Sequence, residues 1–293
     1  MKNISLIFIT SCLLISCDWF KRPTPQSTLP EFESNPTVSP VAGRVADEAS
    51  GMVDSRNIPG HIWTHEDGLN PNEIILINHQ GQLVKKFQLP IFNRDWEDLG
   101  IGPGPQNGVN YLYIADIGDN ATQWEQCHIY RFAEPKSVNE EVGAIDKITF
   151  KYPDGKFDAE CILVDPTTKD IYIVTKMDLN VRLYQLPYPQ STTETITAKF
   201  LRTIPYNLIT SGSVASDGKQ IIIRSYFVLF YFIKKDNETI ADALGRASDL
   251  KLPYKIEPQG EAVCFDRNDK GYFTISEAGD GKTGTNLYYY ARK

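Results

Sequence analysis

The sequence has 293 residues, of which 41% are hydrophobic, and a formal net charge of −7. A chain of this length and composition can bury a large core, which excludes a disordered protein. Its negative charge and lack of a basic run argue against a nucleic-acid partner, because binding phosphates requires clustered Lys and Arg.

The N-terminus has the pattern of an export signal. Lys2 precedes an apolar run from Ile4 to Ile15, which is too short to cross a bilayer as a permanent helix. The ending Leu-Ile-Ser-Cys resembles a bacterial lipobox. Residues 1–16 are therefore predicted to be a lipoprotein signal peptide, and lipidation of Cys17 would anchor the protein to a membrane of the bacterial cell envelope. An ordinary cleaved signal with an incidental Cys17 is the alternative. Which side of the envelope the protein faces stays open.

Residues 17–36 are rich in Pro, Ser and Thr and contain little apolar surface to bury. This composition is typical of an extended, flexible tether. The folded domain is accordingly predicted to span residues 37–293, and we expect it to be monomeric.

The predicted domain is all-β, because it contains short runs of Ile, Val, Tyr and Phe separated by turn residues, and no helical periodicity of useful length. Five similar segments follow one another, each with an apolar strand, a turn, a second strand, a polar cluster and an aromatic third strand. Their first residues are Ser50, Glu97, Glu160, Ser213 and Glu261. A period of roughly 50 residues is typical of propeller blades.

A fourth strand is recognisable in the first four repeats but not in the fifth. The segment TVSPVAGRVA, residues 37–46, can supply it. In such a closure the N-terminal strand completes the last blade and removes the open sheet edge. The sequence therefore predicts a five-bladed β-propeller, with six blades as the alternative.

Hairpin pairing predicts where the polar residues lie. The second strand of each blade ends at the face where the first begins, so Glu160 should lie beside Lys176. The first residues of all five repeats should point towards the central axis, while Asp158 should face the rim. Carboxylates about 5 Å apart repel by about 3 kcal/mol per pair at an effective dielectric constant near 20. Protonation or water could relieve this repulsion. A calcium ion also fits, because calcium accepts an irregular set of oxygen ligands.

The series of inward residues resembles that of the calcium-activated nucleotidase (apyrase) family, five-bladed propellers with a central calcium ion. This resemblance implies that Ser50, Glu97, Glu160, Ser213 and Glu261 bind calcium. It also implies hydrolysis of phosphate esters or anhydrides. In that reaction Lys176 and Arg224 would bind a small anionic substrate, and Asp67, Asp116 or Asp119 would orient the attacking water.

Four phrases, DWED, DIGDN, DAE and QGEA, resemble those of uncharacterised bacterial secreted propellers. This second resemblance implies no activity. A non-catalytic propeller that carries a structural ion and binds a protein or glycan of the envelope therefore stays open beside the enzyme. The remaining cysteines, Cys127, Cys161 and Cys264, lie in apolar strand contexts and are expected to be buried free thiols.

Overall fold

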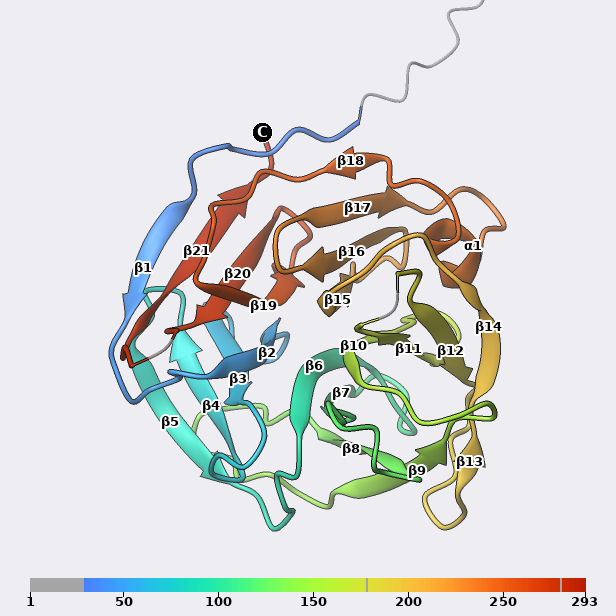
Figure 1. The fold of residues 1–293 in the computed structure, drawn as a ribbon. Coiled ribbons are helices and arrows are strands. Elements are labelled where there is room, and N and C mark those ends of the chain that lie inside the picture. The colour runs from blue at the N-terminus through green and yellow to red at the C-terminus, as the bar shows by residue number, and fades with distance from the viewer. Residues whose placement is uncertain (1–28, 178, 280) are drawn as a thin grey trace, which may run out of the picture.

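The five predicted repeats form five sheets around a central axis (Figure 1). The computed structural model describes residues 29–177, 179–279 and 281–293; the predicted signal peptide and Cys17 lie outside the described residues. The prediction of an all-β, five-bladed propeller is confirmed. The alternative of six blades is wrong.

Each blade contains four antiparallel strands. Blade 1 comprises β2 (Ala49–Asp54), β3 (His61–Glu66), β4 (Glu73–Asn78) and β5 (Leu83–Gln88). Blade 2 comprises β6 (Trp96–Pro103), β7 (Asn110–Asp116), β8 (Cys127–Ala133) and β9 (Asp146–Lys151), and β13 (Ile196–Thr197) pairs in parallel with β9. Blade 3 comprises β10 (Ala159–Val164), β11 (Ile171–Thr175), β12 (Arg182–Leu186) and β14 (Lys199–Thr203). Blade 4 comprises β15 (Ile209–Val214), β16 (Gln220–Ser225), β17 (Leu229–Ile233) and β18 (Leu250–Lys251). Blade 5 comprises β19 (Gln259–Phe265), β20 (Gly271–Glu277), β21 (Thr285–Ala291) and β1 (Thr37–Val41).

The N-terminal strand closes the ring, as predicted. β1 pairs with β21 in an antiparallel register in which Thr37 lies opposite Tyr289 and Val41 lies opposite Thr285. In Figure 1 the blue strand β1 flanks the red strands of the last blade. This pairing gives the outer edge of blade 5 a fourth strand, which the end of the chain does not supply.

Ordered contacts begin before the predicted domain boundary. Phe32 forms an isolated antiparallel bridge with Arg292, and its ring packs edge-on against Tyr231 and Tyr272. The residue is 6% exposed. The last part of the predicted tether is therefore packed against the fourth and fifth blades.

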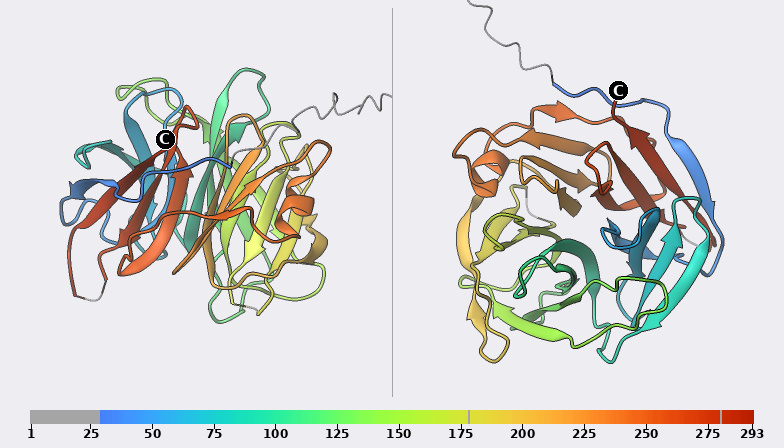
Figure 2. Two further views of the ribbon diagram at one scale, coloured as in Figure 1. Left: turned by 90° about the horizontal axis from the view of Figure 1, so that it is seen from above. Right: turned by 180° about the vertical axis from the view of Figure 1, so that it is seen from behind.

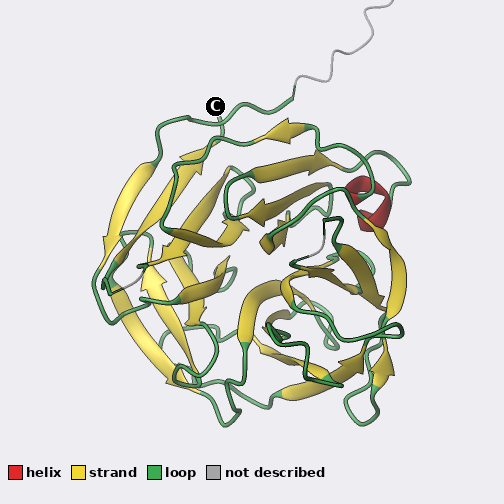
Figure 3. Ribbon diagram, viewed as in Figure 1, coloured by secondary structure: helices red, strands yellow, loops and turns green. Residues whose placement is uncertain are grey.

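One helix, which was not expected from the sequence, interrupts the strands. α1 (Ile240–Leu244) lies between β17 and β18 and is drawn in red in Figure 3. Thr239 caps it and exchanges hydrogen bonds with Asp242, so a capping box was present in the sequence as a signal. Within the described residues, no helix combines the length and apolar character needed to cross a membrane.

Five apolar clusters, one between each pair of neighbouring blades, form the core. Strands of adjacent blades interleave their side chains there, which is why most central strands are apolar on both faces. Cys127, Cys161 and Cys264 lie buried in three of these clusters as free thiols, as predicted. Burial raises the pKa of Cys127 to about 12, so this thiol stays protonated at neutral pH.

The inner strands β2, β6, β10, β15 and β19 all begin at one face of the ring, which we call the upper face. Their antiparallel partners end at that face, and the views in Figure 2 show the ring from the side and from behind. Loops that follow the second strand of each blade consequently lie on the upper face.

A buried carboxylate joins three blades near the axis. Asp98 of β6 accepts hydrogen bonds from the backbone N–H of Ile162 at 2.9 Å and from the Ser211 hydroxyl at 3.0 Å. It also accepts one from the N–H of Leu99 at 2.9 Å. Ser211 in turn accepts a hydrogen bond from the N–H of Val263 at 3.3 Å. These contacts link blades 2, 3, 4 and 5.

We expect Asp98→Ala to lower the free energy of unfolding by about 3 kcal/mol, because three buried donors lose their acceptor at roughly 1 kcal/mol each. Urea denaturation measures this loss. Ser211→Ala, which removes only one of the three donors, is the graded control and should cost about 1 kcal/mol. Equal costs for the two variants would contradict a role for Asp98 as the shared acceptor.

Candidate metal centre

All five inner strands have an irregular register close to the upper face. The shifts lie between Trp96 and Asp98, between Ala159 and Cys161, and between Gly260 and Ala262 in three of the blades. Shifts at the same level occur in β2 and β15. Such bulges leave one residue unpaired and redirect its side chain. The residues at these positions are Ser50 with Gly51, Glu97, Glu160, Thr210 and Glu261.

Glu97 and Glu160 contribute to a cluster of five carboxylates at this level of the channel. Side-chain oxygens of Glu97, Asp158 and Glu160 lie within 4.8 Å of one another, and so do those of Asp67, Asp95 and Glu97. Glu97 therefore belongs to both groups. We call these five residues the acidic cluster. It contains only oxygen donors, the ligand type preferred by calcium and magnesium.

Two oxygens of the acidic cluster are buried without a partner. Asp158 accepts a hydrogen bond from the N–H of Asp119 through Oδ1 at 2.8 Å, and Glu160 pairs with the Lys176 ammonium through Oε1. Asp158 Oδ2 and Glu160 Oε2 have no hydrogen-bond partner among the described residues. A buried carboxylate oxygen without a hydrogen-bond partner lowers the stability of the fold. These two oxygens are therefore free to serve as metal ligands.

The DIGDN segment encloses the cluster from the side. A Cβ atom at Gly118 would collide with Glu97 Oε1 and with the carboxyl group of Asp95, so only glycine fits this position without displacing them. The N–H of Gly118 also donates to the carbonyl of Asp95 at 3.2 Å. A larger side chain here would occupy the space between the two carboxylates.

The acidic residues disturb one another's ionisation. Burial, reinforced by the charges of Asp67 and Asp95, raises the pKa of Glu97 well above its ordinary value. Burial and the neighbouring carboxylates raise the pKa of Asp95 to about 6. On the same face, burial and the charge of Glu261 raise the pKa of Glu277 to about 8. In each case the charged form is disfavoured unless a cation is present.

The structure brings together part of the predicted ligand set. Glu97 and Glu160 lie in the acidic cluster, and Glu160 lies beside Lys176 as predicted. Ser50 is near it, but its hydroxyl donates to the carbonyl of Glu97 at 2.5 Å. Glu261 is buried at the same level without belonging to either group of ligand atoms.

Ser213 lies elsewhere. The bulge in β15 falls between Ile209 and Ser211, so Thr210 takes the position predicted for Ser213, and its hydroxyl donates to Gly260 O at 3.0 Å. Ser213 lies three residues further along the strand and accepts a hydrogen bond from the N–H of Phe265 at 3.1 Å. The structure does not bring it to the acidic cluster.

The predicted aspartates serve different local roles. Asp67 belongs to the acidic cluster. Asp116 accepts a hydrogen bond from the N–H of Asp95 at 3.0 Å and lies 3.6 Å from the Arg94 guanidinium. Both oxygens of Asp119 accept loop N–H groups, from Gln123 at 2.6 Å and Trp124 at 2.8 Å. Asp116 and Asp119 therefore shape the loop that surrounds the cluster.

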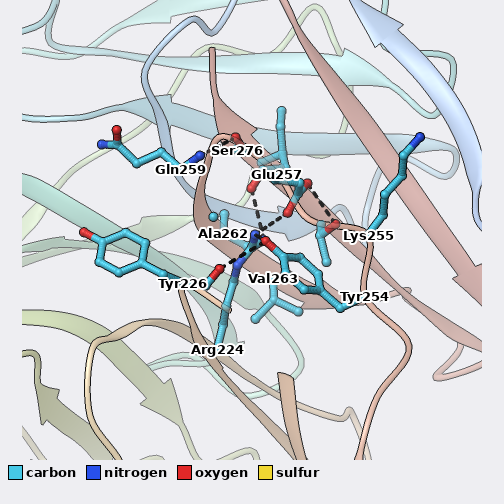
Figure 4. A network of polar contacts seen from close by, with 12 residues as sticks. Arg224, Tyr226, Tyr254, Lys255, Glu257, Gln259, Ala262, Val263 and Ser276 are labelled. Atoms are coloured by element: carbon cyan, nitrogen blue, oxygen red, sulfur yellow. Dashed lines mark hydrogen bonds and ion pairs between the residues drawn. The ribbon is translucent and has the colours of Figure 1, made fainter. Parts of the chain in front are cut away.

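Arg224 is fully buried and occupied by structural partners (Figure 4). Its guanidinium pairs with Glu257 and donates to the carbonyl of Ala262 at 2.5 Å and to the Tyr254 hydroxyl at 3.0 Å. Glu257 comes from the segment that leads into β19, far from Arg224 in sequence. Of the two predicted phosphate-binding cations, only Lys176 lies at the cluster.

Sequence reasoning missed Asp95 and misplaced Asp158. Asp158 was expected at the rim but is 6% exposed and belongs to the acidic cluster. Both residues stand two positions before a bulge glutamate, in the phrases DWED and DAE. That shared spacing was a signal for their common location.

Large exposed apolar side chains lie on the same face of the ring as the acidic cluster. Loops of the upper face carry every large apolar residue of the described chain that is more than half exposed, at 64 to 89% exposure. They are Leu69, Phe92, Met177, Leu179, Phe227 and Ile256. We call these six residues the apolar rim. Such exposure around a polar centre is typical of interaction surfaces.

The fold and the site define a five-bladed β-propeller with an acidic cluster at the upper face, where its inner strands begin. No protein-family model and no curated protein matches the sequence. Among solved structures, the chain is similar to luciferin-regenerating enzyme, with 8% identity and a TM-score of 0.48 over 88% of this chain and 95% of that chain. This likeness is too distant to indicate an activity.

Proposed function

We propose that the acidic cluster binds a calcium ion and that the protein is a calcium-dependent binding module. The observation that carries this proposal is that Asp158 and Glu160 each keep a buried, unpartnered oxygen, Oδ2 and Oε2, and group with a third buried carboxylate, Glu97. Calcium suits an irregular cluster of this kind better than magnesium, which demands near-octahedral geometry. A bound dication would also relieve the repulsion that raises the pKa of Glu97.

The binding module would operate at the cell envelope. This part of the proposal rests on the lipobox-like Leu14-Ile15-Ser16-Cys17 ending, with lipidation at Cys17. The apolar rim supports binding of an envelope protein or glycan, because it puts exposed apolar surface on the same face as the acidic cluster.

A calcium-dependent phosphohydrolase is the second candidate. It is favoured by the position of Lys176, whose ammonium pairs with Glu160 beside the cluster and lies 5.3 Å from the Tyr226 ring centroid. Asp67 belongs to the same cluster and would be the candidate for orienting a water. The burial of Arg224 weakens this candidate, since one cation must then hold the whole phosphate charge.

Calcium titration of the metal-stripped protein tests the proposal. At a calcium concentration about 100 times the Kd, binding should stabilise the fold by about 2.7 kcal/mol and raise the midpoint of thermal unfolding by about 5–10 °C. Asp158→Asn and Glu160→Gln should abolish most of this shift. Glu261→Gln is the matched control, because it removes a buried carboxylate that lies on the same face but outside the cluster. This variant should keep the calcium-dependent shift of the midpoint.

No calcium-dependent shift in the unaltered protein would overturn the metal site. If the shift is present, release of phosphate from nucleoside di- and triphosphates separates the two candidates. Turnover that requires calcium and is lost in Lys176→Met, but not in Lys282→Met, would support the hydrolase. Calcium binding without turnover would support the binding module.

A further inference from the structure

A cavity lies on the lower face of the ring, opposite the acidic cluster. It has a volume of about 560 Å³ and lies where the first and last blades meet at the closure of the ring. Thr37 and Ser39 of β1, the turn after β4 and the turn between β19 and β20 line it. Its size is within the range of small-molecule sites.

The cavity has an aromatic wall held in place from within the fold. The rings of Phe273 and Tyr289 lie 4.6 Å apart between centroids, and the imidazole of His79 lies 4.7 Å from Phe273. Asp54, whose side chain is 1% exposed, fixes that imidazole through an Nε2 to Oδ1 contact of 2.8 Å. The wall is therefore preformed and suits a flat apolar group.

The carboxylates that line the cavity already accept hydrogen bonds from neighbouring residues. Asp54 accepts a hydrogen bond from the N–H of Arg267 at 2.7 Å in addition to its contact with His79. Asp266 accepts hydrogen bonds from the Tyr289 hydroxyl at 2.6 Å and from the backbone N–H groups of Asn268 and Lys270. Carboxylates satisfied in this way offer little to a cationic ligand.

The Arg267 guanidinium is the cation that remains available. Arg267 lines the cavity and is half-buried, and within residues 29–177, 179–279 and 281–293 its guanidinium has no ion-pair or hydrogen-bond partner. A guanidinium next to an aromatic wall matches a carboxylate attached to a flat ring, since it can donate two parallel hydrogen bonds to the carboxylate.

We propose that this cavity binds a small aromatic carboxylate, with its ring against the accessible rings of His79 and Tyr289, which Phe273 supports from behind, and its carboxylate on Arg267. The site is independent of the calcium proposal, because it lies at the other face and shares no residue with the acidic cluster.

Ligand-detected NMR titration with 2-naphthoate tests the site, with 2-naphthamide as the neutral analogue of the same shape. We expect saturable binding of 2-naphthoate with a Kd of about 1 mM or tighter, as is usual for a compact ligand of this size. The amide should bind at least tenfold more weakly, because it lacks the charge that Arg267 recognises.

Three variants locate the binding. Arg267→Gln should weaken 2-naphthoate at least tenfold, whereas Lys270→Gln, which removes an exposed charge from the same turn, should not. Thr37→Trp places a large ring in the cavity from the edge strand and should block both compounds. Thermal unfolding confirms that each variant is folded.

Absence of saturable 2-naphthoate binding up to about 5 mM, well above the Kd expected for a ligand of this size, would overturn the proposal. Equal affinity for the acid and the amide, equal losses in the Arg267 and Lys270 variants, or unchanged binding in Thr37→Trp would each overturn it as well. The measurement needs no calcium, so its outcome is separate from that of the metal proposal.

Discussion

Glu97→Gln is expected to abolish calcium binding and, at the same time, to stabilise the calcium-free protein. Glu97 belongs to both halves of the acidic cluster, so its loss should reduce calcium affinity at least 100-fold. In the calcium-free protein the same carboxyl is buried among like charges, and replacing it with a neutral amide should raise the free energy of unfolding at pH 7 by about 2 kcal/mol. A calcium-free midpoint above that of the unaltered protein would be the observable result.

The pH dependence follows from the direction of the pKa shift. A carboxyl whose pKa is raised in the folded state binds its proton more tightly there than in the unfolded chain. The unaltered calcium-free protein should therefore lose stability as the pH rises above the ordinary glutamate pKa of about 4.3. Asp95, with a pKa of about 6, and Glu277, with a pKa of about 8, extend this loss towards neutral and mildly basic pH.

The gain from Glu97→Gln should consequently vanish at about pH 3, where the carboxyl is protonated in both states, and grow towards pH 8. Thermal unfolding across this range, with calcium removed by chelation, measures the difference. Glu194→Gln, which changes an exposed glutamate, is the matched control and should leave the midpoint unchanged at every pH. A destabilised Glu97→Gln protein at pH 8 would contradict the repulsion inferred here.

Arg224→Ala is expected to cost about 4 kcal/mol of stability, because it leaves the carboxylate of Glu257 buried without its counter-charge. The side chains of Arg224 and Glu257 are 0% and 1% exposed, so bulk solvent does not screen the pair in the unaltered protein. Two backbone carbonyls, of Ala262 and Ile275, would also lose the donor that joins blade 4 to blade 5. Urea denaturation of the folded variant measures the loss.

The double variant Arg224→Met with Glu257→Gln should recover about half of that loss, since it removes both charges and keeps a group that can contact the Thr274 hydroxyl. Calcium affinity should be unchanged in the double variant, because neither residue belongs to the acidic cluster. A stability loss below about 1 kcal/mol for Arg224→Ala would indicate that the ion pair is not structural. A large loss of calcium affinity in a folded variant would place Arg224 in the site after all.

Local sequence was sufficient to predict the blades. Strand alternation, turn residues and a repeat of the aromatic third strand are short-range signals, and they recur five times along the chain. Closure by β1 followed from the same repeat, because the fifth unit lacked a fourth strand. The pairing of Glu160 with Lys176 was predicted as well, since both residues belong to one hairpin.

The composition of the site could not be predicted to the same extent. A bulge moves a single residue out of register, and its position depends on pairing and packing with the neighbouring blade, so Thr210 rather than Ser213 occupies the fourth position. Asp95 and Asp158 reach the acidic cluster because the loops that lead into β6 and β10, the inner strands of adjacent blades, lie side by side in the closed ring. Arg224 appeared free in the sequence, but Glu257 and Tyr254, about 30 residues further along the chain, surround its guanidinium.

The sequence by itself therefore determined the number of blades, their closure and the presence of inward-pointing carboxylates. Only the tertiary structure decided which carboxylates share one site, which cations remain available to a ligand, and that a cavity forms where blade 1 meets blade 5. The physical reason is the range of the interactions. Strands and hairpins depend on neighbours in sequence, whereas the channel and the seam between blades are built from residues that only the closed ring brings together.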